Sequence, residues 1–367
     1  MDKLCTHKKC MGCAACASVC THNAITMQTD KYGFKYPQIV ITKCINCGLC
    51  SKICPILNTT NYNKPQKAIA CFNKVSKERH QSSSGGFVTV AANFIIAQKG
   101  IVYGCAFIPP MQIQHIRCTT KNDILKLQGS KYVQSDLTNI YSYLKEDLKK
   151  GLKVLFIGTP CQIAGIKSLF SKYNNLYTID IICHGVPSLK YLKDTLPTIN
   201  EKIEEIKFRN NTSYNFSIIS SNGISLFERP LSNDMYMKAF FNGITFRPSC
   251  FSCNYAKKER ISDITAGDFW KLKSTIITDK DQGVSLVLIN TQKGQVIFDN
   301  CKNKMFVEER PQEEAFKGNE QLNHPFSKSF RYSIFRNLYP LLGFNKALWC
   351  SLPDKIIFMK LLHLLKK

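Results

Sequence analysis

Eight cysteines in the first 54 residues repeat one spacing twice. Each run has gaps of two, two and three residues, and Pro55 follows the second run. The runs consist of Cys10, Cys13, Cys16 and Cys20, then Cys44, Cys47, Cys50 and Cys54. This spacing is typical of bacterial sequences that hold a pair of [4Fe–4S] clusters. Such clusters move single electrons, so the pattern predicts redox chemistry.

The fourth cysteine of each run is expected to serve the cluster of the other run. One cluster is therefore assigned to Cys10, Cys13, Cys16 and Cys54. The other is assigned to Cys44, Cys47, Cys50 and Cys20. A zinc module is the alternative, because zinc also takes four thiolates, but zinc does not explain two identical four-cysteine runs. Cys5 fits neither run and is interpreted as a spare thiol.

Four later cysteines stand at turns and strand ends. Cys161 lies in a strand-to-helix turn, where a helix N-terminus stabilises a thiolate. Cys183 ends the next expected strand, and Cys250 and Cys253 form a C-x2-C pair. Together they suffice for a third cluster, although spacing alone does not show that they converge. Buried structural cysteines, a zinc site and a redox-active thiol at Cys161 are the alternatives.

Two segments have the composition of an anion-binding site. Ser82–Gly86 places small residues before an expected helix, where free N–H groups attract phosphate. Gly129–Ser135 adds a cation at Lys131, a planar ring at Tyr132 and hydroxyls. A cofactor with phosphates and an isoalloxazine ring would contact the cation, the planar ring and the hydroxyls. Phe269 and Trp270 are expected in the core.

Composition limits the class of protein. The chain has 367 residues, 44 % of them hydrophobic, and a net charge of +24. This length predicts two or three domains. We find no secretory signal and no bilayer-spanning run, so we expect a cytoplasmic protein with reduced thiols. The charge favours an acidic partner, which could be ferredoxin or another acidic electron carrier, a phosphorylated cofactor or an anionic membrane face. The alternative is that the charge only reflects the abundance of Lys in the composition. No nucleic-acid-binding motif is present, so nucleic acid is not expected.

Beyond the cysteine runs, strands alternate with helices. Strands are expected at 101–108, 153–157, 176–183 and 283–290, helices at 87–98, 136–150 and 162–172, and a hairpin at 216–227. The predicted fold is a ferredoxin-like 2[4Fe–4S] domain at 1–62 and a larger α/β domain with a mixed sheet at 63–310. A basic helical extension follows at 311–367. Its end is amphipathic, which makes a membrane surface a further candidate partner, and packing on its own domain is the alternative.

Six motifs occur in an order that resembles a known family. They are Ser84-Gly85-Gly86, Gly129-Ser130-Lys131-Tyr132-Val133, Gly158-Thr159-Pro160-Cys161-Gln162, Cys183-His184-Gly185, Cys250-x2-Cys253 and Gly267-Asp268. Over roughly residues 1 to 300 the chain resembles the β-subunit of coenzyme F420 hydrogenases and dehydrogenases, and the related chlorophyll(ide) reductases. The resemblance implies FAD at Ser84, Gly85, Gly86, Gly129, Ser130, Lys131 and Tyr132. It also implies a cluster beside the flavin at Cys161, Cys183, Cys250 and Cys253.

The predicted function is a FAD-dependent iron–sulfur oxidoreductase. It would relay electrons between [4Fe–4S] clusters and FAD, to or from an organic or deazaflavin-type small molecule. Bacterial relatives with this layout are often linked to surface-polysaccharide loci. His184 and Asp268 are candidates for proton relay, with a hydrogen-bonding or capping role as the alternative. The alternative function is an electron-carrier subunit without its own substrate site.

Overall fold

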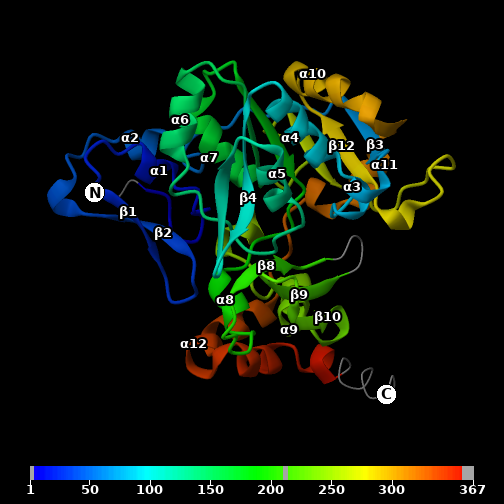
Figure 1. The fold of residues 1–367 in the computed structure, drawn as a ribbon. Coiled ribbons are helices and arrows are strands. Elements are labelled where there is room, and N and C mark those ends of the chain that lie inside the picture. The colour runs from blue at the N-terminus through cyan, green and yellow to red at the C-terminus, as the bar shows by residue number, and fades with distance from the viewer. Residues whose placement is uncertain (1–3, 210–213, 358–367) are drawn as a thin grey trace.

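An eight-stranded sheet forms the centre of the fold, in the order β13-β3-β12-β11-β7-β6-β4-β5 (Figure 1). The computed structural model describes residues 4–209 and 214–357. The strands are β3 (Lys67–Asn73), β4 (Ile101–Ile108), β5 (Gln112–Cys118), β6 (Val154–Gly158), β7 (Leu176–Ile181), β11 (Ile264–Asp268), β12 (Ser285–Ile289) and β13 (Met305–Arg310). Strands β4, β6, β7 and β11 run parallel, and the other neighbours pair antiparallel. The predicted mixed sheet is confirmed.

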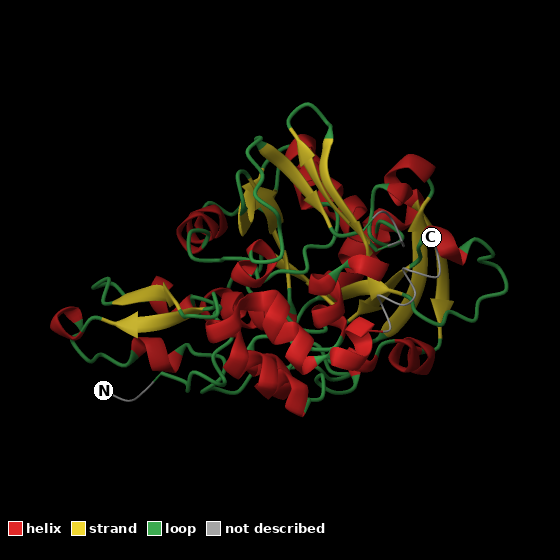
Figure 2. Cartoon of the chain, turned by 90° about the horizontal axis from the view of Figure 1, so that it is seen from below, coloured by secondary structure: helices red, strands yellow, loops and turns green. Residues whose placement is uncertain are grey.

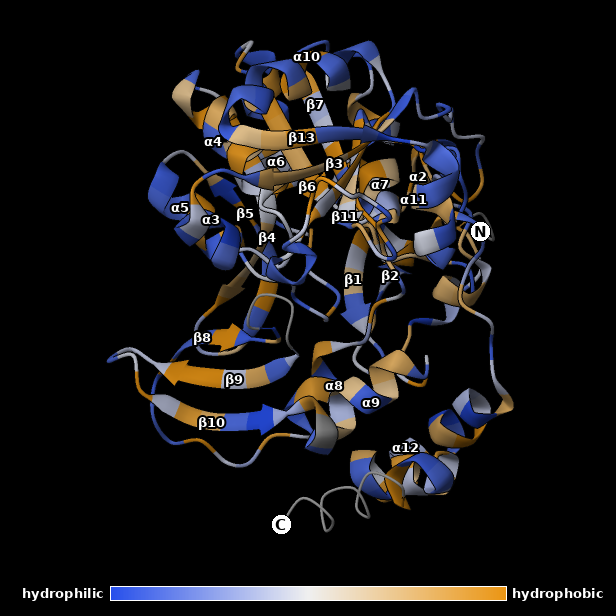
Figure 3. Cartoon of the chain, turned by 90° about the vertical axis from the view of Figure 1, so that its right-hand side faces the viewer, coloured by the Kyte–Doolittle hydropathy of each residue, from blue (hydrophilic) through white to orange (hydrophobic). Residues whose placement is uncertain are grey.

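Helices cover both faces of this sheet, which explains why two of its strands are buried along their whole length. Every residue of β6 and β12 is buried. One face carries α4 (Phe87–Ala97), α5 (Lys121–Leu127) and α10 (Gln292–Cys301). The other face carries α6 (Tyr141–Lys149), α7 (Pro160–Phe170) and α11 (Gln312–Gly318). Figure 3 shows the hydrophobic strands inside and the hydrophilic outer surfaces of α5 and α10.

The N-terminal unit lies at one end of the molecule (Figures 1 and 2). It contains α1 (Ala15–Ser18), β1 (Ile25–Thr29), β2 (Lys35–Ile39), η1 (Ile41–Lys43) and α2 (Leu49–Lys52). Strands β1 and β2 form an antiparallel hairpin. Asp30 fixes its turn by accepting hydrogen bonds from the backbone N–H groups of Tyr32 and Phe34, both at 2.9 Å.

A second, smaller sheet lies below the large one in Figure 3. It consists of β8 (Ile203–Lys207), β9 (Asn215–Ser220) and β10 (Ser225–Pro230), all antiparallel. Its neighbours are α8 (Leu189–Lys193), η2 (Leu231–Asn233), α9 (Met235–Phe241) and α12 (Phe330–Ser351). Aromatic side chains from α8, α9 and α12 share one core. In it the rings of Tyr191 and Phe335 pack edge-on, with their centres 5.5 Å apart. The remaining short elements are α3 (Ser76–His80), η3 (Pro248–Ser252), η4 (Lys280–Gln282), η5 (Lys302–Lys304) and η6 (Glu320–Leu322).

Most predicted elements lie where the sequence places them, with local shifts at their ends. Strand β4 has the predicted bounds, whereas α6 begins at Tyr141 and not at residue 136. The delay has a local cause, because the Asp136 carboxylate accepts bonds from the N–H and hydroxyl of Thr138 and so holds a turn. The domain divisions at 62 and 310 stay predictions.

The C-terminal amphipathic segment falls mainly on residues 358–367, which lie outside the described residues. Within the described ranges, no helix combines the length and the apolar character needed to cross a membrane. Helix α12 itself packs against the aromatic core beside the small sheet.

Candidate functional site

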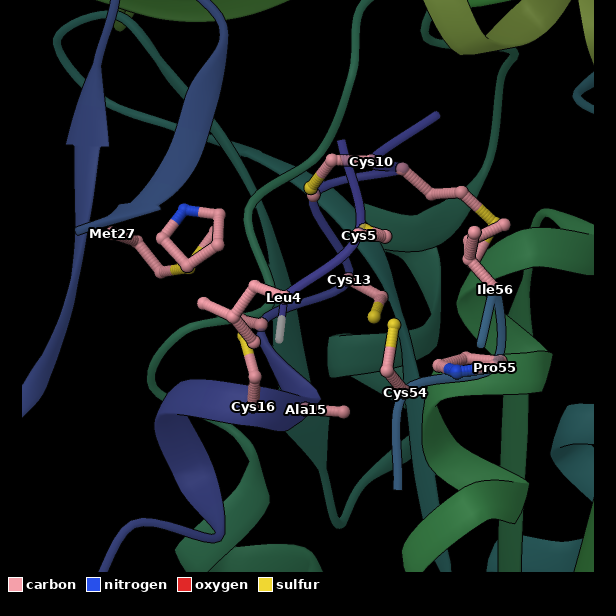
Figure 4. Close-up of a pocket in the computed structure, with 14 residues that line it drawn as sticks. Leu4, Cys5, Cys10, Cys13, Ala15, Cys16, Met27, Cys54, Pro55 and Ile56 are labelled. Carbon is pink, nitrogen blue, oxygen red and sulfur yellow. The ribbon is translucent and has the colours of Figure 1, made fainter. Parts of the chain in front are cut away.

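The two cysteine runs separate into two cavities, each lined by three cysteines of one run and one of the other. Cys10, Cys13, Cys16 and Cys54 line the first cavity, which also contains Cys5 (Figure 4). Its volume is about 20 Å³, because Leu4 and Cys5 lie against the other side chains. The grouping is the one expected when each run lends its fourth cysteine to the other.

The second cavity has a volume of about 50 Å³ and is lined by Cys20, Cys44, Cys47 and Cys50. In the part of the chain that the structure describes, no three His, Cys, Asp or Glu side chains meet closely enough to hold one metal ion. A cubane fits this donor set, because each of its four thiolates binds a different iron, whereas zinc needs four ligands around one atom.

Cys5, expected to be a spare thiol, lies against two cysteines of the first group. The Cys5 thiol donates toward Cys10 and Cys54, which lowers the pKa of each to about 6 and raises that of Cys5. Arg247 also lowers the pKa of Cys10. Burial, together with the nearby Cys10, Cys54 and Cys50, raises the pKa of Cys16 to about 12. The two cavities adjoin, because α1, which carries Cys16, contacts α2, which carries Cys50.

The four later cysteines come together from three parts of the large domain. Cys161 is the second residue of α7, Cys183 follows β7, and Cys250 and Cys253 lie in and just after η3. Burial raises the pKa of Cys183, and the charges of Cys250, Cys161 and Cys253 raise it further. Burial, followed by Cys253 and Cys161, raises the pKa of Cys250 to about 12. The four thiols therefore lie within range of one another's charge.

Helix α7 joins this third group to the first cavity. Cys161 and Gly165 are four residues apart, so they share one face of the helix, about one 5.4 Å turn apart. At Gly165 the helix touches Cys13, since an added Cβ would lie 2.7 Å from the Cβ of Cys13. The Tyr141 hydroxyl donates to the Cys13 carbonyl at 2.6 Å and fixes the same contact from α6.

A cavity of about 450 Å³ opens at the carboxyl ends of β6, β7 and β11. Ligands of open α/β sheets bind at this edge, and the volume is in the range of small-molecule sites. Most residues predicted for the flavin line it, as do two cysteines of the third group and both proton-relay candidates. These are Ser84, Gly86, Gly129, Ser130, Lys131, Tyr132, Cys161, Cys183, His184 and Asp268.

Gly85 is not among the residues that line this cavity. A Cβ at Gly85 would lie 2.3 Å from the Cys71 carbonyl oxygen and 2.6 Å from the Ser285 nitrogen. Its small size therefore lets the chain pass close to β3 and β12. Gly86 begins α4 with φ of 88°, a left-handed conformation that favours glycine. Both glycines have roles in the fold itself.

Lys131 lies at the cavity wall but its amine is already engaged. It donates to the carbonyl oxygens of Lys126 at 3.0 Å and Gln128 at 2.6 Å, at the end of α5. Desolvation lowers its pKa to about 8. A bound phosphate would compete with these two carbonyls for the ammonium group.

Sequence reasoning missed several residues of this cavity. Arg209 lines it and pairs with Asp268 at 2.8 Å, so the Asp268 carboxylate has a fixed cation beside it. Desolvation lowers the pKa of His184, while the charge of Asp268 opposes this effect. Trp270, expected in the core, is 40 % exposed and borders the cavity, so that expectation was wrong, whereas Phe269 is buried. No spacing signal distinguishes Arg209 or Trp270 in the sequence.

Fold and site together indicate an iron–sulfur protein with a larger α/β domain, and family comparison agrees. Residues 9–57 match the family model for a 4Fe-4S dicluster domain. Residues 151–315 match the family model for the C-terminal part of the β-subunit of coenzyme F420 hydrogenase/dehydrogenase. Over these residues the chain is similar to that family of β-subunits, in agreement with the resemblance of its motifs.

Individual relatives are distant in sequence. The chain is 21 % identical to the F subunit of F(420)H(2) dehydrogenase of Methanosarcina mazei, over 83 % of this chain and 86 % of the relative. It is 22 % identical to the coenzyme F420-dependent sulfite reductase of Methanocaldococcus jannaschii, over 78 % of this chain and 45 % of the relative. A chain of the F420-reducing [NiFe] hydrogenase complex from Methanosarcina barkeri aligns with a TM-score of 0.46 and 20 % identity, over 71 % of this chain and 90 % of that one.

His115, on the wall of the large cavity, predicts a pH effect on stability. It is buried between the Ser135 hydroxyl and the Ile157 carbonyl, which its Nε2 contacts at 2.9 Å. Burial lowers its pKa to about 4 from 6.5. As the pH falls from 6.5 to about 4, His115 gains a proton in the unfolded chain before it does in the folded chain. Stability should fall by about 3 kcal/mol across the window, at about 1.4 kcal/mol for each unit of pKa difference.

The measurement is thermal unfolding at pH 7 and pH 5.5, with His115→Gln as the comparison. The wild type should lose more stability than the variant on acidification. Equal losses in the two proteins would contradict a neutral buried His115.

Proposed function

We propose that the protein is a FAD-dependent iron–sulfur oxidoreductase, in which three clusters connect an external electron carrier with a small molecule in the large cavity. One observation carries this proposal: the cysteine groups form a continuous series. It begins at the exposed Cys47, passes through both N-terminal cavities, and reaches Cys161 and Cys183 on the wall of the large cavity. Such a series supports transfer of single electrons between surface and cavity.

Three features of the large cavity support a flavin nucleotide as its ligand. Gly86, Phe87 and Thr89 of the first turn of α4 border it, where the helix dipole and free N–H groups favour phosphate. Lys131 would add a positive charge, and Tyr132 an aromatic ring. FAD, when bound, exchanges two electrons with an organic molecule and single electrons with clusters. His184 and the Arg209–Asp268 pair would hold or deliver protons at the same wall.

An electron-carrier subunit without a substrate site is the second candidate. The cysteine series alone would serve it equally well. The open cavity favours the first function, because a carrier has no use for a cavity of about 450 Å³ beside its last cluster. The family relatives suggest a deazaflavin as one candidate substrate. An organic molecule of surface-polysaccharide metabolism is the second candidate.

The iron content tests the third cluster. Anaerobically prepared protein should hold about twelve irons, four for each cubane. Replacing Cys250 and Cys253 by Ser should remove about four of these irons, because it removes two of the four thiolates. Cys350→Ser is the control, since Cys350 is exposed on α12 and should leave the count unchanged. An unchanged iron content in the double variant would exclude this pair as ligands.

Flavin retention tests the large cavity. Lys131→Ala should lower the FAD content of purified protein, because a phosphate would lose its cation. Lys126→Ala is the matched control on the same segment, since its exposed amine pairs with Asp123, at 3.6 Å. FAD released by denaturation would be measured by absorbance. Equal FAD content in both variants would place the phosphates elsewhere.

The surface around the second cavity is expected to receive the carrier. Ile41, Ile45 and Leu49 are 65 %, 62 % and 40 % exposed there, and Lys43 and Lys52 are exposed beside them. No Asp or Glu occurs between Asp30 and Glu78. An apolar centre with a basic rim suits an acidic partner, whose approach a positive field accelerates.

Charge reversal tests this docking surface. Lys43→Glu with Lys52→Glu should slow reduction by a small acidic ferredoxin at least several-fold at low salt, and the difference should shrink as salt screens the charges. Lys302→Glu with Lys304→Glu is the matched control, because η5 follows α10 on the other side of the molecule in Figure 1. Equal slowing in the two double variants would show that only net charge matters.

A further inference from the structure

Arg247 differs from the other buried arginines of the described residues. Arg79, Arg209 and Arg260 each contact a carboxylate: Asp279 at 2.6 Å, Asp268 at 2.8 Å and Asp180 at 3.1 Å, respectively. Arg247 is only 1 % exposed, yet within the ranges 4–209 and 214–357 no carboxylate lies within 4.0 Å of it.

Within the described ranges, three hydrogen bonds from the Arg247 side chain go to uncharged oxygen atoms. Its Nε donates to the Cys10 carbonyl at 2.7 Å, its Nη2 to the Lys35 carbonyl at 2.9 Å, and its Nη1 to Gln134 Oε1 at 3.0 Å. The guanidinium carbon lies 4.1 Å from the centre of the Tyr36 ring. These contacts orient the cation rigidly, but none of them neutralises it.

A buried guanidinium without a counter-charge is strongly unfavourable. The nearby groups that could become anions are thiols. Arg247 lies three residues before Cys250, and its side chain reaches the loop of Cys10, 237 positions away. Its side chain donates to the Cys10 carbonyl, while its own backbone carbonyl accepts from the N–H of Cys250 at 2.9 Å. The guanidinium therefore stands between the first and third cysteine groups.

We propose that Arg247 is the fixed counter-charge of the two clusters on either side of it, and that it raises their reduction potentials. The inference rests on the proposed function, because it requires clusters at both cysteine groups. Reduction adds one electron and no proton to a cluster, so it makes the cluster more negative. A buried cation stabilises this reduced state more than the oxidised one, and the local charge is among the factors that set cluster potentials.

Gln134 allows charge to be separated from geometry. Its Oε1 accepts from Arg247, and its Nε2 donates to the Met11 carbonyl at 2.9 Å. Gln134→Glu would place a carboxylate against the guanidinium and neutralise it without removing it. Gln134→Ala removes the same hydrogen bonds and leaves the positive charge in place. Arg247→Gln removes the charge itself, and Arg247→Lys keeps it.

The experiment is an anaerobic redox titration of the full chain, followed by electron paramagnetic resonance, with iron measured in each variant. Arg247→Gln and Gln134→Glu should each make the potentials of two clusters more negative. The expected change in the ratio of reduced to oxidised cluster is about tenfold at a fixed potential, which is about 59 mV for one electron. Gln134→Ala and Arg247→Lys should stay close to wild type, as should the cluster of Cys20, Cys44, Cys47 and Cys50.

The outcomes separate this inference from the proposed function. Wild-type protein without iron would refute the proposed function. Full iron content with unchanged potentials in Arg247→Gln and Gln134→Glu would overturn the inference alone. An equal shift in Gln134→Ala would overturn it as well, because the cause would then be lost packing and not charge. If Arg247→Gln fails to assemble its clusters, comparing the potentials of Gln134→Glu and Gln134→Ala still tests whether the charge matters.

Discussion

The contact between Cys13 and the backbone of α7 at Gly165 determines how the N-terminal unit sits on the larger domain. No side chain fits there, since an added Cβ would also lie 3.0 Å from the Cys13 sulfur and 3.1 Å from the Tyr141 hydroxyl. The hydrogen bond from Tyr141 and the three bonds of Arg247 hold the same interface. The two units are therefore joined at their cysteine groups.

The large sheet determines where the wall of the large cavity lies. Its parallel strands end at one edge, and the residues after β6, β7 and β11 form a single wall there. Cys161 and Cys183 belong to that wall, so the third cysteine group faces the first cavity through α7 and the large cavity through the strand ends. About one turn of α7 thus separates Cys161, in the third cysteine group, from the contact with Cys13, in the first group.

Much of this arrangement could be predicted from local patterns, and the rest depends on long-range contacts. The cysteine spacing predicted how the eight N-terminal thiols divide between two cavities, and apolar runs predicted strands such as β4. The role of Gly85 could not be predicted, because its neighbours on β3 and β12 are distant in sequence. In the sequence, Arg247 can be recognised only as a residue that precedes a C-x2-C pair. Its reach to Cys10 follows from tertiary packing alone.

The spread of the cysteine groups along the sequence has a consequence for biogenesis. A ribosome releases the N-terminal end first, and metal binding is coupled to folding of the site that receives it. Both N-terminal groups are complete once Cys54 has emerged, whereas the third group awaits Cys253. Under the proposed function, the order of synthesis therefore allows the outer clusters to assemble before the inner one. The inner site is completed last, in a chain whose outer sites can already be folded.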